Sequence, residues 1–141
     1  MSMRHHAALL LSLMVLAGCA TNANSPGASL PAQDSPQAQQ ALQQLRDDYN
    51  QGRYGAVIRS VALDGRLHDE ASLATRTEAY KLQAFSYCVQ DYKQLCEESF
   101  TRILQLQADY DLSPAEKGHP QWGPVFTSVQ SRYQNQTQAT R

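Results

Sequence analysis

Apolar residues recur at three- and four-residue spacing along the chain after residue 35, and this spacing indicates amphipathic helices. The first helix begins at Ser35-Pro36, an N-cap followed by a first-turn proline, and Gly52 can end it. Further helices are expected over residues 54–63, about 71–89, about 92–107 and about 124–134. Because no segment alternates convincingly at period two, the sequence predicts an all-α domain over residues 36–134.

A weak internal repeat groups these helices into pairs. Tyr49 and Tyr54 bracket one turn, and Tyr87 and Tyr92 bracket another, 38 residues later (87 − 49). The segment "DYNQGRYGAVI" resembles the corner of a tetratricopeptide repeat, although the usual period is roughly 34. The resemblance implies tetratricopeptide-like antiparallel hairpins, about five helices in all. Any antiparallel helical hairpin would favour similar residues, and two units need a cap from the last helix or from a partner.

The N-terminus carries a targeting signal. Residues 7–16 are almost wholly apolar but too few to span a bilayer, so they are typical of a signal peptide. The following Leu16-Ala17-Gly18-Cys19 resembles the lipobox of bacterial lipoproteins. The resemblance implies removal of residues 1–18 and anchoring in the membrane through acyl chains on Cys19. The alternative is an ordinary secreted signal in which Cys19 is coincidental.

The residue after the cysteine is Ala20 rather than the aspartate that retains lipoproteins in the inner membrane. The expected location is therefore the periplasmic face of the outer membrane of a Gram-negative cell. Residues 20–35 are small and polar with proline and glycine, so residues 19–35 are expected to form a lipidated, flexible tether. Residues 135–141 are expected to be a polar tail.

The charge balance argues against nucleic acid as a partner. The chain has 12 Lys+Arg and 13 Asp+Glu, and removal of Arg4 with the signal leaves 11 against 13, a formal charge of −2. Such a chain has neither the basic surface that nucleic acids require nor a cluster of basic residues that would bind anionic lipid.

Two further cysteines are Cys88 and Cys96, near the end of the third expected helix and the start of the fourth. Residues so placed in a hairpin can face each other, and in an exported chain a cysteine pair favours a disulfide over a metal site. Closing so small a ring contributes about 2–3 kcal/mol of stability. The alternative is a pair of reduced, buried cysteines. The Cys-x-x-Cys spacing of a thiol-redox site is absent.

Catalytic motifs are also absent from the sequence. After maturation only His68 and His119 remain of the four histidines, and the sequence contains no metalloprotease, phosphate-loop or serine-hydrolase motif. His119 near Glu116 is thin support for acid–base chemistry. We therefore expect no enzymatic activity, no metal and no cofactor other than the covalent lipid on Cys19.

The segment 112–126 interrupts the helical pattern. Ser113–Glu116 has the pattern of a capping box with a first-turn proline, and Gly118 ends the turn of helix that it starts. His119-Pro120 favours an extended step, and Gly123-Pro124 begins the last helix. We interpret the segment as a structural corner, with a docking surface for a partner as the alternative. Its principal residues under either interpretation are His119, Pro120, Trp122 and Phe126.

Two stretches, "AFSYCVQDYKQLCEESFTRIL" and "DYDLSPAEKGHPQWGPVF", together resemble the TssQ-family lipoproteins associated with type VI secretion systems. The resemblance spans about residues 84–126 and implies an accessory envelope component, without identifying a binding residue. The expected function is that of a non-enzymatic, lipid-anchored helical adaptor with a protein partner, which assists assembly or anchoring of a type VI membrane complex. The alternatives are a pilotin-like lipoprotein for another assembly such as a secretin, and a passive envelope tether.

Overall fold

The computed structural model describes residues 31–139, and this part of the chain contains helices and no strand. The helices are α1 (Pro36–Asn50), α2 (Tyr54–Leu63), the 3-10 helix η1 (Gly65–Leu67), α3 (Leu73–Val89), α4 (Lys93–Leu106), α5 (Pro114–Lys117) and α6 (Gly123–Ala139). The prediction of an all-α domain is confirmed. None of the described helices is long and apolar enough to cross a membrane.

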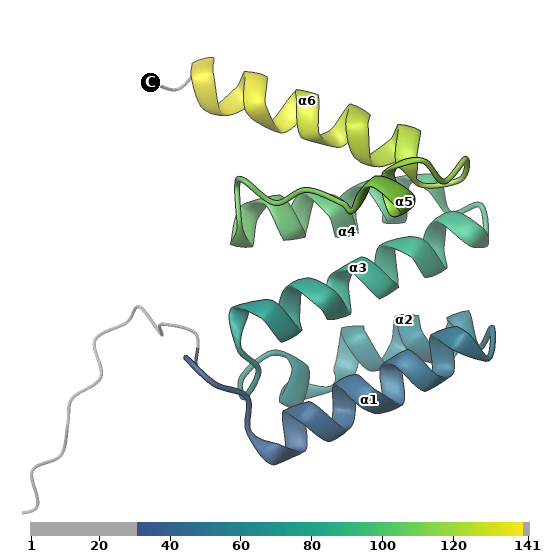
Figure 1. Ribbon diagram of the computed structural model, residues 1–141, viewed down its shortest axis with the longest axis vertical. Helices are drawn as coiled ribbons and strands as arrows, with labels where there is room; N and C mark the ends of the chain where they lie inside the picture. Colours follow the sequence, from purple (N-terminus) through teal and green to yellow (C-terminus); the bar gives the residue numbers. More distant parts are fainter. Residues whose placement is uncertain (1–30, 140–141) are drawn as a thin grey trace, which may run out of the picture.

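The helices form a stack along the long axis of the molecule (Figure 1). The α1–α2 pair lies at one end, α3 and α4 follow, and α6 lies at the other end, with the short α5 beside α4. Each helix packs mainly on its neighbours: α1 on α2 and α3, α2 on α3, α3 on α4, and α4 on α6. Most contacts are therefore local in the stack, as in repeat proteins.

The helix ends follow from the local sequence. The hydroxyl of Ser35 accepts a hydrogen bond from the N–H of Ala38 at 3.0 Å, and Ser72 caps α3 in the same way. The turn between α1 and α2 contains Gly52 at φ 71°, and the turn between α3 and α4 contains Asp91 at φ 61°. Both residues thus adopt the left-handed conformation that lets a helix end and the chain reverse.

The core has two parts that join through shared tyrosines. The part near α1 contains Leu42, Leu45, Val57, Val61, Leu67 and Leu82, and the part near α6 contains Phe85, Cys96, Phe100, Ile103, Leu104, Trp122 and Phe126. Tyr49 and Tyr80 pack against both parts. Hydrophobic burial is therefore continuous from one end of the stack to the other.

The folded part begins earlier than the sequence suggested, because the expected tether is fixed at its last two residues. The Asp34 carboxylate accepts hydrogen bonds from the Ser72 N–H and the Thr75 hydroxyl, each at 2.7 Å. Although burial opposes ionisation, these hydrogen bonds hold the pKa of Asp34 below its ordinary value. The Ser35 N–H donates to the Glu70 carbonyl at 3.1 Å. Residues 34 and 35 thus lie against the N-terminus of α3.

Two elements differ from the expected boundaries. The expected loop between the second and third helices contains η1, whose Leu67 is buried in the core. Helix α6 continues through residues 135–139, which we expected to be a polar tail. These residues are polar and exposed. Because a solvated helical turn shows no apolar periodicity, the sequence pattern does not reveal it.

Candidate functional site

The corner before α6, within residues 112–126, contains the capping box that the sequence predicted. The Ser113 hydroxyl accepts from the Glu116 N–H at 3.3 Å, and the Glu116 carboxylate accepts from the Ser113 N–H at 3.0 Å, which completes a capping box. Helix α5 lasts one turn and ends before Gly118. The Gly123 N–H then donates to the His119 carbonyl at 2.9 Å, so the chain turns directly into α6.

Trp122 fastens this corner to α3. Its side chain is only 9% exposed, and its Nε1–H donates to the Glu116 carbonyl at 2.8 Å. Its ring stacks on Phe85 of α3, with centroids 4.2 Å apart, and on His119, with centroids 3.3 Å apart. The ring is thus enclosed mainly by its own domain.

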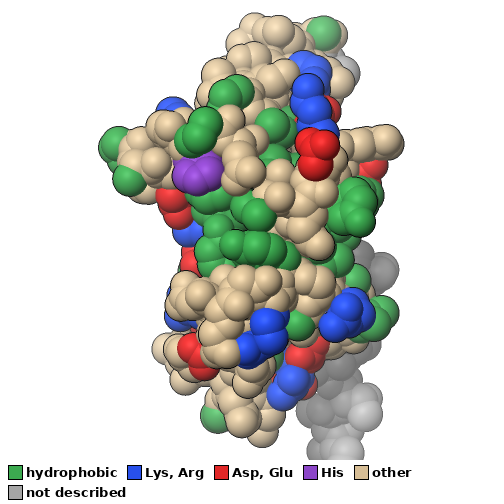
Figure 2. All heavy atoms as spheres, turned by 90° about the vertical axis from the view of Figure 1, so that its right-hand side faces the viewer, with side chains coloured by type: hydrophobic (Ala, Val, Ile, Leu, Met, Phe, Trp, Pro, Cys, Tyr) green, Lys and Arg blue, Asp and Glu red, His purple; other side chains and the backbone are tan. Residues whose placement is uncertain are grey.

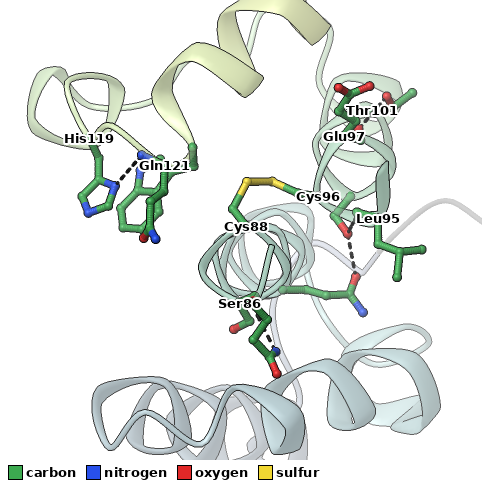
Figure 3. The surroundings of a disulfide bond; sticks show 12 residues. Ser86, Cys88, Leu95, Cys96, Glu97, Thr101, His119 and Gln121 are labelled. Atoms are coloured by element: carbon green, nitrogen blue, oxygen red, sulfur yellow. Dashed lines mark hydrogen bonds between the residues drawn. A yellow bond between two sulfur atoms is a disulfide. The ribbon is translucent and has the colours of Figure 1, made fainter. Parts of the chain in front are cut away.

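The other corner residues divide between core and surface. Phe126 is fully buried and lies edge-on to Phe100, with centroids 5.2 Å apart. Pro120 is exposed. His119 is half-buried, and its Nδ1 accepts a hydrogen bond from the Gln121 N–H at 3.3 Å (Figure 3). His119 therefore helps to hold the corner, through its stacking and its contact with the turn.

The three candidate cysteines fall in two places. Cys88 and Cys96 form a disulfide with an S–S distance of 2.05 Å, which joins the end of α3 to the start of α4 (Figure 3). Cys96 is fully buried beside the aromatic core. Cys19 lies outside the described residues.

A cleft of about 270 Å³ opens between α1, α3 and α5, on the face of α3 that the corner reaches. Its lining residues are Arg46, Tyr49 and Asn50 of α1, Glu78, Lys81, Leu82 and Phe85 of α3, and Glu116 of α5. Three elements distant in sequence thus contribute to one small concave site, and we take it as the candidate functional site.

Lys81 lies at the centre of the charged residues in the cleft. Its Nζ is 2.8 Å from Glu78 Oε2 and 2.8 Å from Glu116 Oε1, and its side chain is 15% exposed. Burial alone would lower the pKa of Lys81, but the hydrogen bonds to Glu116 and Glu78 outweigh it and raise the pKa to about 12. The ammonium is therefore charged throughout the physiological range, and it holds α3 to α5 rather than acting as a base.

Glu116 uses its two carboxylate oxygens for different purposes. Oε2 accepts from the Ser113 backbone in the capping box, and Oε1 pairs with Lys81. Burial opposes ionisation of this carboxyl, but the bonds from Lys81 and Ser113 lower its pKa below the ordinary value. The corner and the cleft are thus coupled through one side chain.

An aromatic series runs behind the charged residues. Tyr54 meets Tyr49 with centroids 5.6 Å apart, Tyr49 meets Phe85 at 6.4 Å, and Phe85 stacks on Trp122. Burial raises the pKa of the Tyr49 hydroxyl, which keeps it protonated. Figure 2 shows hydrophobic side chains gathered in a band across the side of the stack that carries the α1–α2 and α3–α4 turns.

Comparisons with models of known protein families, with curated proteins and with solved structures found no match for this chain. In the part of the chain that the structure describes, no group of three His, Cys, Asp or Glu side chains is arranged to hold a metal ion.

The sequence alone did not identify the cleft. The capping role of Glu116 is a local pattern and was recognisable, but its pairing with Lys81 joins residues 35 positions apart (116 − 81). The only local signal was the three-residue spacing of Glu78 and Lys81, which is common on solvated helix faces.

The ion pair between Glu116 and Lys81 makes stability depend on pH in a defined direction. The lowered pKa of Glu116 implies stabilisation that is complete above its unfolded pKa and is lost as the pH falls through the folded pKa. The raised pKa of Lys81 implies stabilisation that is complete below its unfolded value and is lost as the pH rises through about 12. The contribution of this ion pair to the free energy of unfolding should therefore be constant between roughly pH 5 and pH 10.

We expect Glu116→Gln to lower the free energy of unfolding by about 1 kcal/mol at pH 7, because Gln can keep the cap but not the charge. The difference from the wild type should shrink as the pH falls below the ordinary pKa of a glutamate, because the stabilisation implied by the lowered pKa of Glu116 is lost as the pH falls through the folded value. Urea unfolding followed by circular dichroism at several pH values measures both quantities. A difference that stays constant down to pH 3 would show that the charge of Glu116 does not contribute.

Proposed function

We propose that this protein is a non-enzymatic lipoprotein, held at the periplasmic face of the outer membrane, whose helical domain is an adaptor for an envelope complex. The observation that carries the proposal is the Leu16-Ala17-Gly18-Cys19 motif at the start of a chain whose folded part is a stack of helices with a side cleft. Acyl chains on Cys19 would hold the domain at the membrane, because two or more chains anchor a protein stably.

We propose further that α1–α2 and α3–α4 are two tetratricopeptide-like hairpins. In support, each turn brings together the two tyrosines that bracket it, edge-on, with centroids 5.6 Å apart for Tyr49–Tyr54 and 6.3 Å for Tyr87–Tyr92. Each turn also has a left-handed residue, Gly52 or Asp91. Helix α6 would then be the cap, since one side packs on α4 and exposed polar residues cover the other.

Within this class, we propose that the adaptor assists assembly or anchoring of a type VI secretion membrane complex. The resemblance of residues 84–126 to TssQ-family lipoproteins supports this assignment. The resembling segment includes the disulfide, which joins α3 to α4, and Trp122 and Glu116, which hold the corner beside the cleft. The cleft offers a place for a protein partner.

The first test concerns anchoring. We expect Cys19→Ser to abolish lipidation, so that the protein no longer fractionates with outer membranes, because the acceptor thiol is removed. Density-gradient fractionation and mass spectrometry of the N-terminal peptide measure this. Ser25→Ala, a small change in the expected tether, should fractionate like the wild type. Co-sedimentation of the Cys19→Ser protein with outer membranes would contradict the lipoprotein assignment.

The second part of the test identifies the partner. The wild-type protein would be crosslinked in intact envelopes of its own host and purified, and its partners identified by mass spectrometry. We expect components of a type VI membrane complex, and deletion of the gene should impair secretion by that system. Specific capture of a secretin instead would favour the pilotin-like alternative, and normal secretion after deletion would overturn the proposed role.

A further inference from the structure

The polar groups of the cleft divide into those that satisfy one another and those that do not. The Lys81 ammonium pairs with both the Glu78 and the Glu116 carboxylates, each at 2.8 Å. Arg46, by contrast, is 46% exposed, and its nearest approach to the Glu78 carboxylate, from Nε to Oε1, is 3.8 Å, which is too long for a hydrogen bond. Among the described residues, its terminal guanidinium nitrogens and the side-chain amide of Asn50 have no hydrogen-bond partner. The uncommitted groups at this rim are therefore mainly donors.

The guanidinium of Arg46 has the geometry to bind a carboxylate. Its planar set of N–H groups can donate two parallel hydrogen bonds to the two oxygens of one carboxylate. An asparagine amide can donate to one peptide carbonyl and accept from one peptide N–H, which suits an extended backbone. Arg46 and Asn50 lie at the same cleft, one turn apart on α1.

Apolar and aromatic side chains line part of the same cleft. Leu82 and Phe85 of α3 line it, and Tyr49 forms its aromatic wall. Its volume of about 270 Å³ lies below the range of roughly 300–1,000 Å³ typical of whole small-molecule sites, so it suits one side chain and the adjoining backbone. The enclosed Trp122 stacks on Phe85, which restrains the Phe85 ring at the cleft.

At the two ends of the described stack, the outward faces of α1 and α6 are polar. The outward side of α1 carries the exposed Gln39, Gln40, Gln43 and Gln44, and that of α6 carries the exposed Thr127, Ser131 and Gln134. Solvated polar faces of this kind end a helical stack rather than recruit another helix.

We infer that the cleft between α1, α3 and α5 binds a peptide segment of a partner protein in which an acidic side chain lies next to a large apolar side chain. The acidic group pairs with Arg46, Asn50 holds the peptide backbone, and the apolar side chain lies against Tyr49, Leu82 and Phe85. This inference rests on the proposed adaptor function and specifies the chemistry of the partner. It does not depend on which secretion machine supplies that partner.

The dipeptide N-acetyl-Glu-Phe-amide is a minimal probe, and N-acetyl-Gln-Phe-amide has nearly the same shape but a neutral amide in place of the carboxylate. Each would be titrated into the exported protein in detergent micelles, with binding followed by NMR through the backbone amides of α1 and α3 and the methyl groups of Leu82. We expect saturable shifts at the cleft with a dissociation constant on the order of 1 mM for the Glu probe. The Gln probe should bind about tenfold more weakly, because it lacks the charge-assisted pair.

Two arginine variants provide the decisive comparison. Arg46→Gln should remove the preference for the Glu probe, while Arg59→Gln, at an exposed arginine of α2 outside the cleft, should preserve it. Unchanged amide spectra of the free variants verify that both are folded. Absence of saturable shifts, equal binding of the two probes, or preference retained in Arg46→Gln would overturn the inference. Because the titration uses no membrane or secretion assay, its failure is distinguishable from failure of the anchoring proposal.

Discussion

Replacing Trp122 by alanine is expected to lower the free energy of unfolding by about 3–5 kcal/mol. The substitution removes a ring that is 9% exposed, its stacking on Phe85, and the hydrogen bond from Nε1 to the Glu116 carbonyl. These contacts join the corner to α3, so α6 would lose its attachment on the side of α5. A small domain has a total stability of only about 5–15 kcal/mol, and the loss is therefore a large fraction of it.

Urea unfolding followed by circular dichroism measures this loss without depending on the tryptophan signal. Leu63→Ala is a suitable control, because it also truncates a large apolar side chain, but one that is 82% exposed, and its effect should lie within about 0.5 kcal/mol. In the wild-type protein, fluorescence of the single tryptophan should be blue-shifted and should move to the red only on unfolding. An exposed emission spectrum together with an unchanged stability of Trp122→Ala would show that the ring is a surface feature.

Much of the helical architecture was predictable because its signals are local. Ser35 and Ser113 precede prolines at helix starts, and both act as N-caps in the structure. Helix α2 spans the predicted residues 54–63, and the ends of α3 and α4 lie within two residues of the predicted ones. Caps, prolines and apolar spacing act over four or five residues, so a single sequence reveals them.

The parts that escaped prediction depend on long-range contacts or on solvated residues. The attachment of Asp34 joins it to Ser72 and Thr75, about 40 residues away, and composition alone made the segment resemble a free tether. The turn of α6 over residues 135–139 is polar and exposed, so it carries no apolar periodicity from which a helix could be predicted. The pairing of Lys81 with Glu116 likewise exists only after the corner has folded onto α3.

The corner also shows how local and long-range information combine. Glycine and proline indicated where one helix ends and the next begins, which placed Trp122 and Phe126 at a junction of helices. They did not indicate what these rings contact, because Phe85 and Phe100 belong to helices defined by their own periodicity. The hydrophobic pattern identifies the rings as core candidates, and only the packed stack determines which partners they meet.

Gly123→Ala is expected to destabilise the protein by about 2–3 kcal/mol, although alanine normally favours a helix over glycine. Gly123 is the first residue of α6 and is buried. A Cβ atom at this position would overlap the carbonyl oxygen of Lys117 and lie 2.9 Å from its carbonyl carbon. Since these atoms belong to the backbone of α5, no side-chain rotation relieves the overlap, and the corner must move away from α6.

Gly55→Ala is the matched control, because the same chemical change occurs in a helix without a backbone obstacle. A Cβ at Gly55 meets only Nη1 of the flexible Arg59 side chain, at 3.4 Å. This variant should be stabilised by about 0.5–1 kcal/mol, since alanine restricts the unfolded chain and fits the helical conformation. Urea unfolding of both variants should therefore give changes of opposite sign. If Gly123→Ala were as stable as the wild type, the close approach of α5 to the start of α6 would be wrong, and with it the path of the chain around the corner.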